Sequence, residues 1–570
     1  MKRYLISFMF VAITCYDCGM AQPQTSTSPF EYREVYLPET LSGEQKALDL
    51  NSIDRDWGIW GHNLSVVLPK SPSQTVYARN GNSVNTDQFC FTSNALFNYI
   101  CDFIDDNYGR DRTTRFAILP NDNGTVCLCP QCVACGNRAG DASGALYNML
   151  ERLTEKYPKH LFFTSYYSTA AGLPKKPLPA NAGVLISSIF YPLSPVHTPQ
   201  EDEFLALLRE WSGFTKRIYV WDYINNFDDY FTPFPILDVV QHRLRLYADA
   251  GVTGVFFNGS GTDYSTMSRL KTHVIASLLQ NPDMDWRPLL MKLSNDWYPV
   301  TGDLIGRFMT FQEDMVRNVG RPLPMYEGVT REVGCYLPAA EFVSFHEELL
   351  GILPMIKDPE RTEVQLMSRA MMFTRLELMR INSDTLGARR MLDGLDRMVK
   401  QGITTYSEAG GSTDSYISEY RYMLRHIDET GRRNKLRGVR LEPLTALDED
   451  YSDISVLTDG MLGLPSSYHC GQMLSSADPS LRIAIPKKGL KRVRVYMTRN
   501  AIYHITLPLS VSLSVDGNVV ARKVPKPMAG NNNRSMVEFD LPAGYSGSPV
   551  LTVVRNKDER TMALDEIEGF

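Results

Sequence analysis

The stretch RIYVWDYINNFDDYFTPFPILDVVQHRLRLYADAGVTGVFFNG, residues 217–259, decides the fold class of this chain. It begins with an apolar run typical of a strand that is covered on both faces (217–223). An amphipathic helix pattern follows (234–251) and ends in a glycine, which is a helix stop signal. A second apolar run (253–259) completes the unit. A strand, a helix and a strand in this order predict two parallel strands joined by a crossover helix.

The same alternation extends over residues 30–285. Further strand-like runs occur at 30–37, 57–68, 115–120, 160–167 and 182–191, and further helix patterns occur at 93–109 and 141–158. Alternation over this length predicts a (β/α)8-type barrel. Seven strands are evident in the pattern and the place of the eighth is open. An open doubly wound sheet is therefore the alternative.

Two further domains are expected, because 570 residues suffice for roughly three or four. Residues 286–437 show helix patterns one after another, which predicts an all-α segment packed on the barrel. The methionines in this segment are interpreted as core filling; they are Met367, Met371, Met372 and Met379. Residues 438–570 alternate short apolar runs with turn residues, which predicts a β-sandwich. The expected fold class is multidomain α/β.

Residues 1–21 have the pattern of a secretory signal peptide. Two basic residues precede an apolar stretch (4–14) that is too short to span a bilayer, and Gly-Met-Ala at 19–21 resembles a cleavage site. We expect an exported protein in the periplasm, at the cell surface or secreted, with a polar linker at 22–29. Lipid attachment at Cys15 is a less favoured alternative. No later stretch reaches about 18 consecutive apolar residues, so no transmembrane span is expected.

The charge of the chain argues against a nucleic-acid partner. Its net charge is −6, its isoelectric point is near 5.9, and its basic residues are scattered. An uncharged or weakly charged ligand fits better. The 29 tyrosines offer flat apolar faces with polar rims that suit sugar rings, although core packing explains any single one of them more simply.

Several motifs occur in the order found in a known family. They are EYREVY (31–36), WGIWGHNLSVVLP (57–69), FCFTSNA (89–95), PNDNG (120–124), CLCPQC (127–132), VWDYINNFDDYFTPFP (220–235), GVTGVFFNGSG (251–261) and LQNPDMDWRPLL (279–290). Over roughly residues 30–300 the chain resembles a family of secreted proteins, frequent in gut and oral Bacteroidetes, that is catalogued as a domain of unknown function. In addition, LTDGMLGLPSSYHCGQ (457–472) resembles a discoidin-type or galactose-binding-like sandwich.

That family is similar to glycoside hydrolases with a TIM-like barrel, including endo-β-N-acetylglucosaminidases that act on complex N-glycans. It is more distantly similar to α-glucuronidase and β-hexosaminidase barrels. The resemblance implies a glycoside hydrolase acting on N-acetylglucosamine-containing oligosaccharides or glycoprotein glycans, without a catalytic cofactor. The alternative is a non-catalytic carbohydrate-binding protein of a surface glycan-uptake system. A zinc-dependent hydrolase is disfavoured, because no His-Glu-x-x-His motif occurs.

Two aspartates are the candidate catalytic carboxyls. Glycoside hydrolysis usually uses a carboxyl pair, and barrel enzymes place such groups where strands end. Asp122 directly follows the run FAILP, and Asp222 ends the run RIYVWD. The alternatives are an Asx-turn role for Asp122 and a capping role for Asp222. With an N-acetylglucosamine substrate the acetamido oxygen can itself attack, so that one carboxyl orients it and the other protonates the leaving group.

Further polar and aromatic residues are candidates for substrate binding: Glu34, His62, Asn63, Tyr166, Tyr223 and Asn258. A hydrogen-bonded core histidine is the commoner role for a residue such as His62, and an ion pair with Arg33 is the favoured alternative for Glu34. No glutamate stands at the end of a strand-like run after residue 60, so a loop is the other source of an acid. Its candidates are Asp228, Asp229 and Asp263.

Four cysteines follow the turn that carries Asp122: Cys127, Cys129, Cys132 and Cys135. Their Cys-x-x-Cys spacing suits a structural zinc ion or disulfides, and the expected export slightly favours disulfides. A second Cys-x-x-Cys arm is absent, although Cys90 or Cys101 could come near in space. In either case the cysteines hold the loop that presents Asp122.

Overall fold

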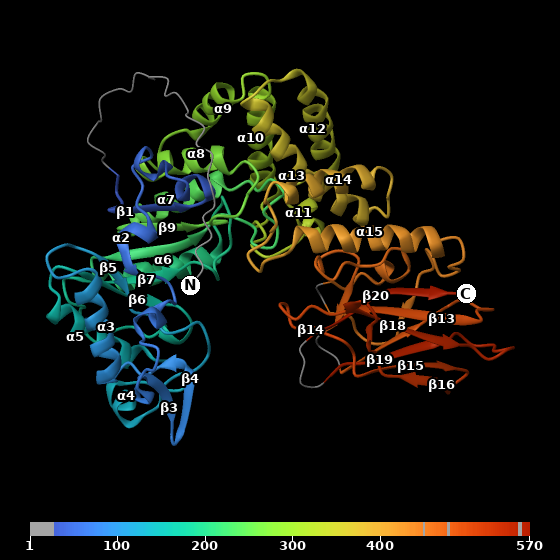
Figure 1. The fold of residues 1–570 in the computed structure, drawn as a ribbon, viewed down its shortest axis with the longest axis horizontal. Coiled ribbons are helices and arrows are strands. Elements are labelled where there is room, and N and C mark those ends of the chain that lie inside the picture. The colour runs from blue at the N-terminus through green and yellow to red at the C-terminus, as the bar shows by residue number, and fades with distance from the viewer. Residues whose placement is uncertain (1–27, 449–450, 476–478, 557–560) are drawn as a thin grey trace.

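The computed structural model describes residues 28–448, 451–475, 479–556 and 561–570. Figure 1 shows a parallel sheet with its helices on the left, a group of helices at the upper right, and the C-terminal sheets at the lower right. The predicted signal peptide, Cys15 and most of the linker at 22–29 lie outside the described residues. None of the described helices is both long enough and apolar enough to cross a membrane.

Seven strands form the parallel sheet, in the order β1-β9-β8-β7-β6-β5-β2. Each of the seven strand-like runs contributes one strand: β1 (Tyr32–Tyr36), β2 (Trp57–Ile59), β5 (Arg115–Ala117), β6 (Leu161–Tyr166), β7 (Ala182–Ser187), β8 (Ile218–Tyr223) and β9 (Gly254–Asn258). The order follows the chain from β2 to β9 and does not reverse, unlike that of a doubly wound sheet. The predicted α/β class with a parallel sheet is confirmed.

The sheet curls around an aromatic core to which every one of its strands contributes. Tyr32 of β1, Trp57 of β2 and Tyr219 of β8 belong to this core. The rings of Tyr32 and Trp57 meet edge to face at 5.9 Å, although β1 and β2 are the two edge strands. Among the described residues no ladder joins these edges. A closed eight-stranded barrel therefore stays a prediction.

Glu34 lies at the seam between the two edge strands and does not pair with Arg33. Its Oε1 accepts the N–H of Ile53 at 2.7 Å, and its Oε2 accepts the hydroxyl of Tyr32. Arg33 points to the other side of the strand and forms an ion pair with Asp49 at 2.8 Å. The ion pair favoured for these neighbours is wrong, because successive side chains of a strand face opposite ways.

Five helices pack on the outer face of the sheet: α3 (Asn94–Asn107), α5 (Ser143–Lys156), α6 (Pro199–Ser212), α7 (Leu237–Asp249) and α8 (Ser268–Gln280). The connections contain the short helices α1 (Pro38–Leu41), α2 (Ile53–Asp56) and α4 (Pro130–Cys135) and a hairpin of β3 (Tyr77–Asn80) and β4 (Ser83–Phe89). Helix α3 shows which local features of the sequence make these segments helical. Its N-cap Ser93 accepts the N–H of Leu96, and its apolar residues at helical spacing are buried.

Seven helices follow in the segment predicted to be all-α: α9 (Trp286–Trp297), α10 (Gly302–Val319), α11 (Val329–Val333), α12 (Ala339–Ile352), α13 (Glu360–Ile381), α14 (Ala388–Lys400) and α15 (Thr413–Thr430). Trp286 and Ile305 share one buried cluster with Val255 of the parallel sheet, so both parts have a common core. Met367, Met371 and Met372 are buried and Met379 is partly buried, which confirms their interpretation as core filling.

Two largely antiparallel sheets form the C-terminal part. One contains β10 (Glu442–Pro443), β12 (Ser480–Ala484), β19 (Val550–Val554), β15 (Ser510–Val515) and β16 (Asn518–Lys523). The other contains β11 (Met473–Ser475), β20 (Thr561–Gly569), β13 (Arg492–Thr498), β18 (Asn531–Asp540), β17 (Pro527–Met528) and β14 (Ile505–Thr506). Leu481, Val495 and Leu551 share the core between them. Helix α15 lies beside β20, where His426 contacts Glu568 at 2.8 Å (Figure 1).

Candidate active site

A cavity of about 300 Å³ lies where the strands of the parallel sheet end. Residues in or after six strands line it: Gly61 and His62 after β2, Leu119 and Asp122 after β5, Ser165 and Tyr167 at β6, Leu185, Ser187 and Ile189 at β7, Trp221 and Tyr223 in β8, and Asn258 in β9. Tyr326 and Glu408 from the helical segment complete the wall. The carboxyl edge of a parallel sheet is the usual place for a binding site.

The turn after β5 presents Asp122 to this cavity. The side-chain amides of Asn121 and Asn123 both donate to the carbonyl of Asp87, at 2.9 and 2.8 Å. Gln88 accepts the N–H of Asn121 and donates to its carbonyl, each at 3.0 Å. The neighbours of Asp122 therefore hold the turn, and its own carboxylate stays exposed at the cavity.

Tyr167 and His62 flank Asp122. Burial raises the pKa of the Tyr167 hydroxyl. The charge of Asp122 and a hydrogen bond to this carboxylate raise that pKa further. The His62 ring lies 6.1 Å from the Tyr167 ring. Its Nδ1 is 2.6 Å from the carbonyl oxygen of Pro120. Since a carbonyl only accepts, Nδ1 carries a proton and donates it to this carbonyl.

Glu408 is a second carboxylate at the cavity, and sequence reasoning missed it. It is exposed in the loop between α14 and α15, far from any strand. Its N–H donates to the carbonyl of Phe227 at 2.8 Å, and its Oε2 accepts the hydroxyl of Tyr326 at 3.2 Å. Partial removal from water and the charge of Asp228 raise the pKa of Glu408, against the effect of the Tyr326 bond. No local pattern marks this loop as functional.

Aromatic and amide side chains form the remaining wall. The Trp221 ring is partly exposed and contacts Phe256 at 4.2 Å between ring centres. The Tyr223 hydroxyl lies 3.2 Å from Ser187 Oγ. Burial raises the pKa of Tyr223. Asn258 is the register partner of Tyr223 on the neighbouring strand. The predicted binding residues His62, Tyr223 and Asn258 thus lie together with Asp122.

Asp222 does not line the cavity, although it stands between two residues that do. Its side chain is fully buried on the outer face of β8, where it forms an ion pair with Arg243 of α7. Ser188 Oγ and the Tyr247 hydroxyl donate to it, each at 2.6 Å. Because side chains alternate along a strand, Trp221 and Tyr223 face inward and Asp222 faces outward. The hypothesis that Asp122 and Asp222 share one cavity is therefore corrected.

Three other predicted binding residues lie away from the cavity. Glu34 is buried within the sheet core, where desolvation raises its pKa to about 7. Asn63 is exposed at the start of a short helical turn. Tyr166 faces outward from β6 and packs edge to face against Trp211, with 6.0 Å between ring centres.

The three loop aspartates proposed as alternative acids have partners elsewhere and do not line the cavity. Asp228 binds His469 at 2.9 Å and the Tyr503 hydroxyl at 2.8 Å. Asp229 is buried and accepts the hydroxyl of Thr232 at 2.5 Å. Asp263 accepts the hydroxyl of Thr405, from the loop that carries Glu408. A loop does supply a second carboxylate, but from the helical segment.

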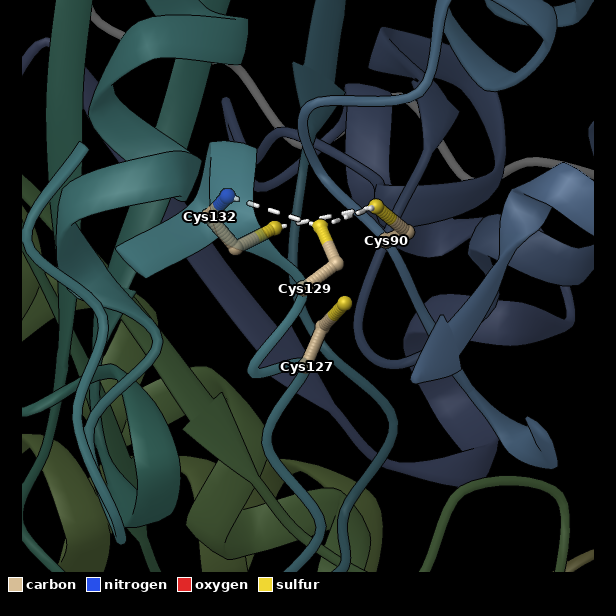
Figure 2. Close-up of side chains that lie close together, drawn as sticks. All are labelled: Cys90, Cys127, Cys129 and Cys132. Carbon is tan, nitrogen blue, oxygen red and sulfur yellow. Dashed lines mark hydrogen bonds between the residues drawn. The ribbon is translucent and has the colours of Figure 1, made fainter. Parts of the chain in front are cut away.

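The cysteines after Asp122 are not joined to one another. All eight cysteines in the described part of the chain are free, so a disulfide-tied loop is not seen there. Three of the predicted metal ligands meet, and Cys90 takes the fourth place in a group that Cys135 does not join. Figure 2 shows this group.

Three solved structures that the chain matches are distant from it in sequence. A family GH115 4-O-methyl-α-glucuronidase with specificity for decorated arabinogalactans is 11% identical with a TM-score of 0.35, over 87% of this chain and 68% of that one. A protein described as an α-L-fucosidase of Bacteroides thetaiotaomicron is 10% identical with a TM-score of 0.17, over 75% and 77%. A fucose-binding module of Streptococcus pneumoniae is 16% identical with a TM-score of 0.18, over 24% and 94%.

These TM-scores are too low to bear on function. None of the curated proteins matches the chain. The segment that contains most of the cavity wall nevertheless has a family match: residues 68–310 match a family described as a domain of unknown function, DUF4838.

Proposed function

We propose that this protein is a glycoside hydrolase that cleaves glycans in the cavity at the carboxyl edge of its parallel sheet. One observation supports it above the others. Asp122 and Glu408, carboxylates from two different parts of the fold, line one cavity together with Trp221, Tyr223 and Tyr326. Glycosidic bonds are usually cleaved by a pair of carboxyls, and aromatic walls suit the sugar rings on either side of the bond.

The lining of the cavity suits a sugar better than a charged ligand. Flat aromatic faces can stack on sugar rings, and hydroxyl and amide groups such as those of Ser165 and Asn258 can bind sugar hydroxyls. A volume of about 300 Å³ is at the small end of the range for ligand pockets. It suits the part of a glycan around the bond to be cleaved.

Glu408 is the proposed general acid. Its pKa is raised by partial desolvation and by the charge of Asp228, so it keeps its proton to a higher pH than an ordinary glutamate. It would donate that proton to the leaving glycosidic oxygen. The Tyr326 hydroxyl, 3.2 Å from its Oε2, orients the carboxyl group.

Asp122 is the proposed partner carboxylate. It would stabilise positive charge at the anomeric carbon or, with an N-acetylglucosamine substrate, orient the acetamido group whose oxygen attacks that carbon. Tyr167 and His62 flank this carboxylate in the cavity. In that case the attack expels the leaving group and forms a cyclic intermediate. Water then opens this ring and gives a proton back to Glu408. N-acetylglucosamine-containing glycans are thus the proposed substrate class, and we propose that the protein meets them after export.

The test is a set of chromogenic glycosides and an N-glycoprotein, assayed with the wild type and with Glu408→Gln and Asp122→Asn. We expect each variant to lose at least about 100-fold in kcat while its melting temperature stays within about 2 °C. The alkaline limb of the kcat/KM profile, which reports the protonated Glu408, should vanish in Glu408→Gln. Glycan binding without any product release would instead favour the non-catalytic carbohydrate-binding alternative.

A further inference from the structure

Four cysteine sulfurs converge beside the loop that carries Asp122 (Figure 2). Cys90 directly follows β4, Cys127 and Cys129 lie in the loop after β5, and Cys132 lies on α4. All four side chains are buried, and their sulfur atoms lie within 4.8 Å of one another. We call these residues the four-cysteine cluster.

The spacing of these sulfurs is that of metal ligands. Cys90 Sγ lies 3.7 Å from Cys129 Sγ and 3.6 Å from Cys132 Sγ. A tetrahedral zinc ion with Zn–S bonds of about 2.3 Å holds its sulfur ligands about 3.8 Å apart. A disulfide would require about 2.05 Å between sulfurs. One ion at the centre of the cluster satisfies both observed distances, whereas a disulfide satisfies neither.

We infer that the four-cysteine cluster binds one zinc ion as a structural site. Four thiolates in tetrahedral arrangement select zinc or iron–sulfur centres, and a single buried ion with four protein ligands has no open position for substrate. The site is therefore distinct from the cavity in which we propose catalysis. Cys135 is outside the cluster and lines a different cavity, next to Lys175.

The surroundings of the cluster fit deprotonated sulfur. The N–H of Arg79 donates to Cys127 Sγ at 3.3 Å, and the N–H of Cys132 donates to Cys129 Sγ at 3.5 Å. The Thr92 hydroxyl lies 3.2 Å from Cys132 Sγ. Donors of this kind around a metal site stabilise the thiolate charge and fix the orientation of the ligands.

The position of the cluster indicates what a bound zinc ion would stabilise. Cys90 follows Gln88 by two residues. The side chain of Gln88 binds both the N–H and the carbonyl oxygen of Asn121. Cys127 lies further along the same loop as Asp122. The zinc ion thus ties together the strand and the loop that flank the Asp122 turn. Its effect on activity rests on the proposed function, whereas its presence does not.

The experiment measures zinc per chain in the full-length protein, with a colorimetric zinc indicator after denaturation and with elemental analysis. We expect one equivalent in the wild type and less than about 0.2 in Cys90→Ser. The matched control is Cys135→Ser, a neighbouring cysteine on the same helix α4 as Cys132, which should keep one equivalent. Loss of zinc in Cys135→Ser with retention in Cys90→Ser would overturn the ligand assignment.

A second measurement does not depend on the folding of variants. Wild-type protein produced with cobalt in place of zinc should show the visible absorption of a tetrahedral tetrathiolate cobalt centre. Metal-free protein with disulfides among the cluster residues by mass spectrometry, or protein that contains iron instead, would overturn the zinc site. Because neither measurement uses catalysis, failure of the zinc site and failure of the proposed hydrolase can be told apart.

Discussion

At the scale of single residues, burial separates carboxylates that are enclosed in the fold from carboxylates that face the cavity. Asp222 and Glu34 are almost completely buried and have all their partners inside the protein. Asp122 and Glu408 are exposed at the cavity. Removal of a buried carboxylate that is paired with a buried cation leaves that cation uncompensated and costs stability, whereas an exposed carboxylate can be changed with little effect on folding.

Substitution of Asp222 should affect stability and not chemistry. In Asp222→Asn the buried guanidinium of Arg243 loses its charge partner, which should cost about 3–5 kcal/mol of unfolding free energy. The folded fraction should keep kcat within about threefold of the wild type. Thermal melts and initial rates check this. Asp122→Asn should give the opposite result, with kcat lost and the melting temperature nearly unchanged. An unchanged melting temperature with lost kcat would contradict our placement of Asp222.

Substitution of Glu34 should stabilise the protein in a pH-dependent way. Desolvation raises its pKa from 4.5 to about 7, so the folded state favours the protonated form. This penalty is absent below about pH 4.5, grows as the pH rises and reaches ~3 kcal/mol above pH 7. Glu34→Gln, which keeps an acceptor for the Ile53 N–H, should therefore be more stable than the wild type at pH 8 and similar at pH 4.5.

Urea unfolding at both pH values tests this prediction. The control is Glu155→Gln, an exposed carboxyl on helix α5, for which we expect no difference at either pH. A stability gain of equal size at pH 4.5 and pH 8 would show that ionisation of Glu34 is not the cause.

At the scale of elements, the loop between α14 and α15 must be held in place, because it carries Glu408. Three contacts anchor it to the parallel-sheet side: Tyr230 N–H to the Tyr406 carbonyl, Glu408 N–H to the Phe227 carbonyl, and the Thr405 hydroxyl to Asp263, each at 2.8 Å. Only the last uses a side chain of the loop.

Removal of that side-chain anchor should impair catalysis more than folding. Thr405→Val removes the hydrogen bond to Asp263, which should cost about 1 kcal/mol of stability. The loosened loop should lower kcat by roughly tenfold, since small displacements of a catalytic group are costly. Thr404→Val, at the exposed neighbouring residue, is the matched control and should keep wild-type kcat. Equal rates in both variants would show that this anchor does not position Glu408.

At the scale of the whole molecule, the three parts share one buried cluster. Phe227 from the sheet side, Phe373 and Tyr416 from the helices, and Leu462 and Tyr496 from the C-terminal part all belong to it. Contacts of Asp228 with His469 and Tyr503 join the same parts. Such shared packing couples their stabilities.

We therefore expect one cooperative thermal transition for residues 28–570. Differential scanning calorimetry measures it, and deletion of the C-terminal part from residue 438 should lower the melting temperature of the remainder by exposing the apolar partners of Leu462. A separate transition for the C-terminal sheets, with an unchanged melting temperature after their deletion, would contradict this coupling.

Local pattern in the sequence by itself determined the elements of the fold and part of the site. Apolar runs and helix patterns such as those of 217–259 report neighbours within a few residues, and the strands and helices follow them. Asp122, His62, Tyr223 and Asn258 were predictable at the cavity because parallel strands end at a common edge.

Only the tertiary structure decided the rest. The outward direction of Asp222 depends on which face of β8 packs against α7, and alternation alone does not say which face is inside. Glu408 and Cys90 reach their sites from distant parts of the chain, as loop packing brings them in. Contacts of this kind depend on how whole elements pack, and no periodicity of a few residues records that packing.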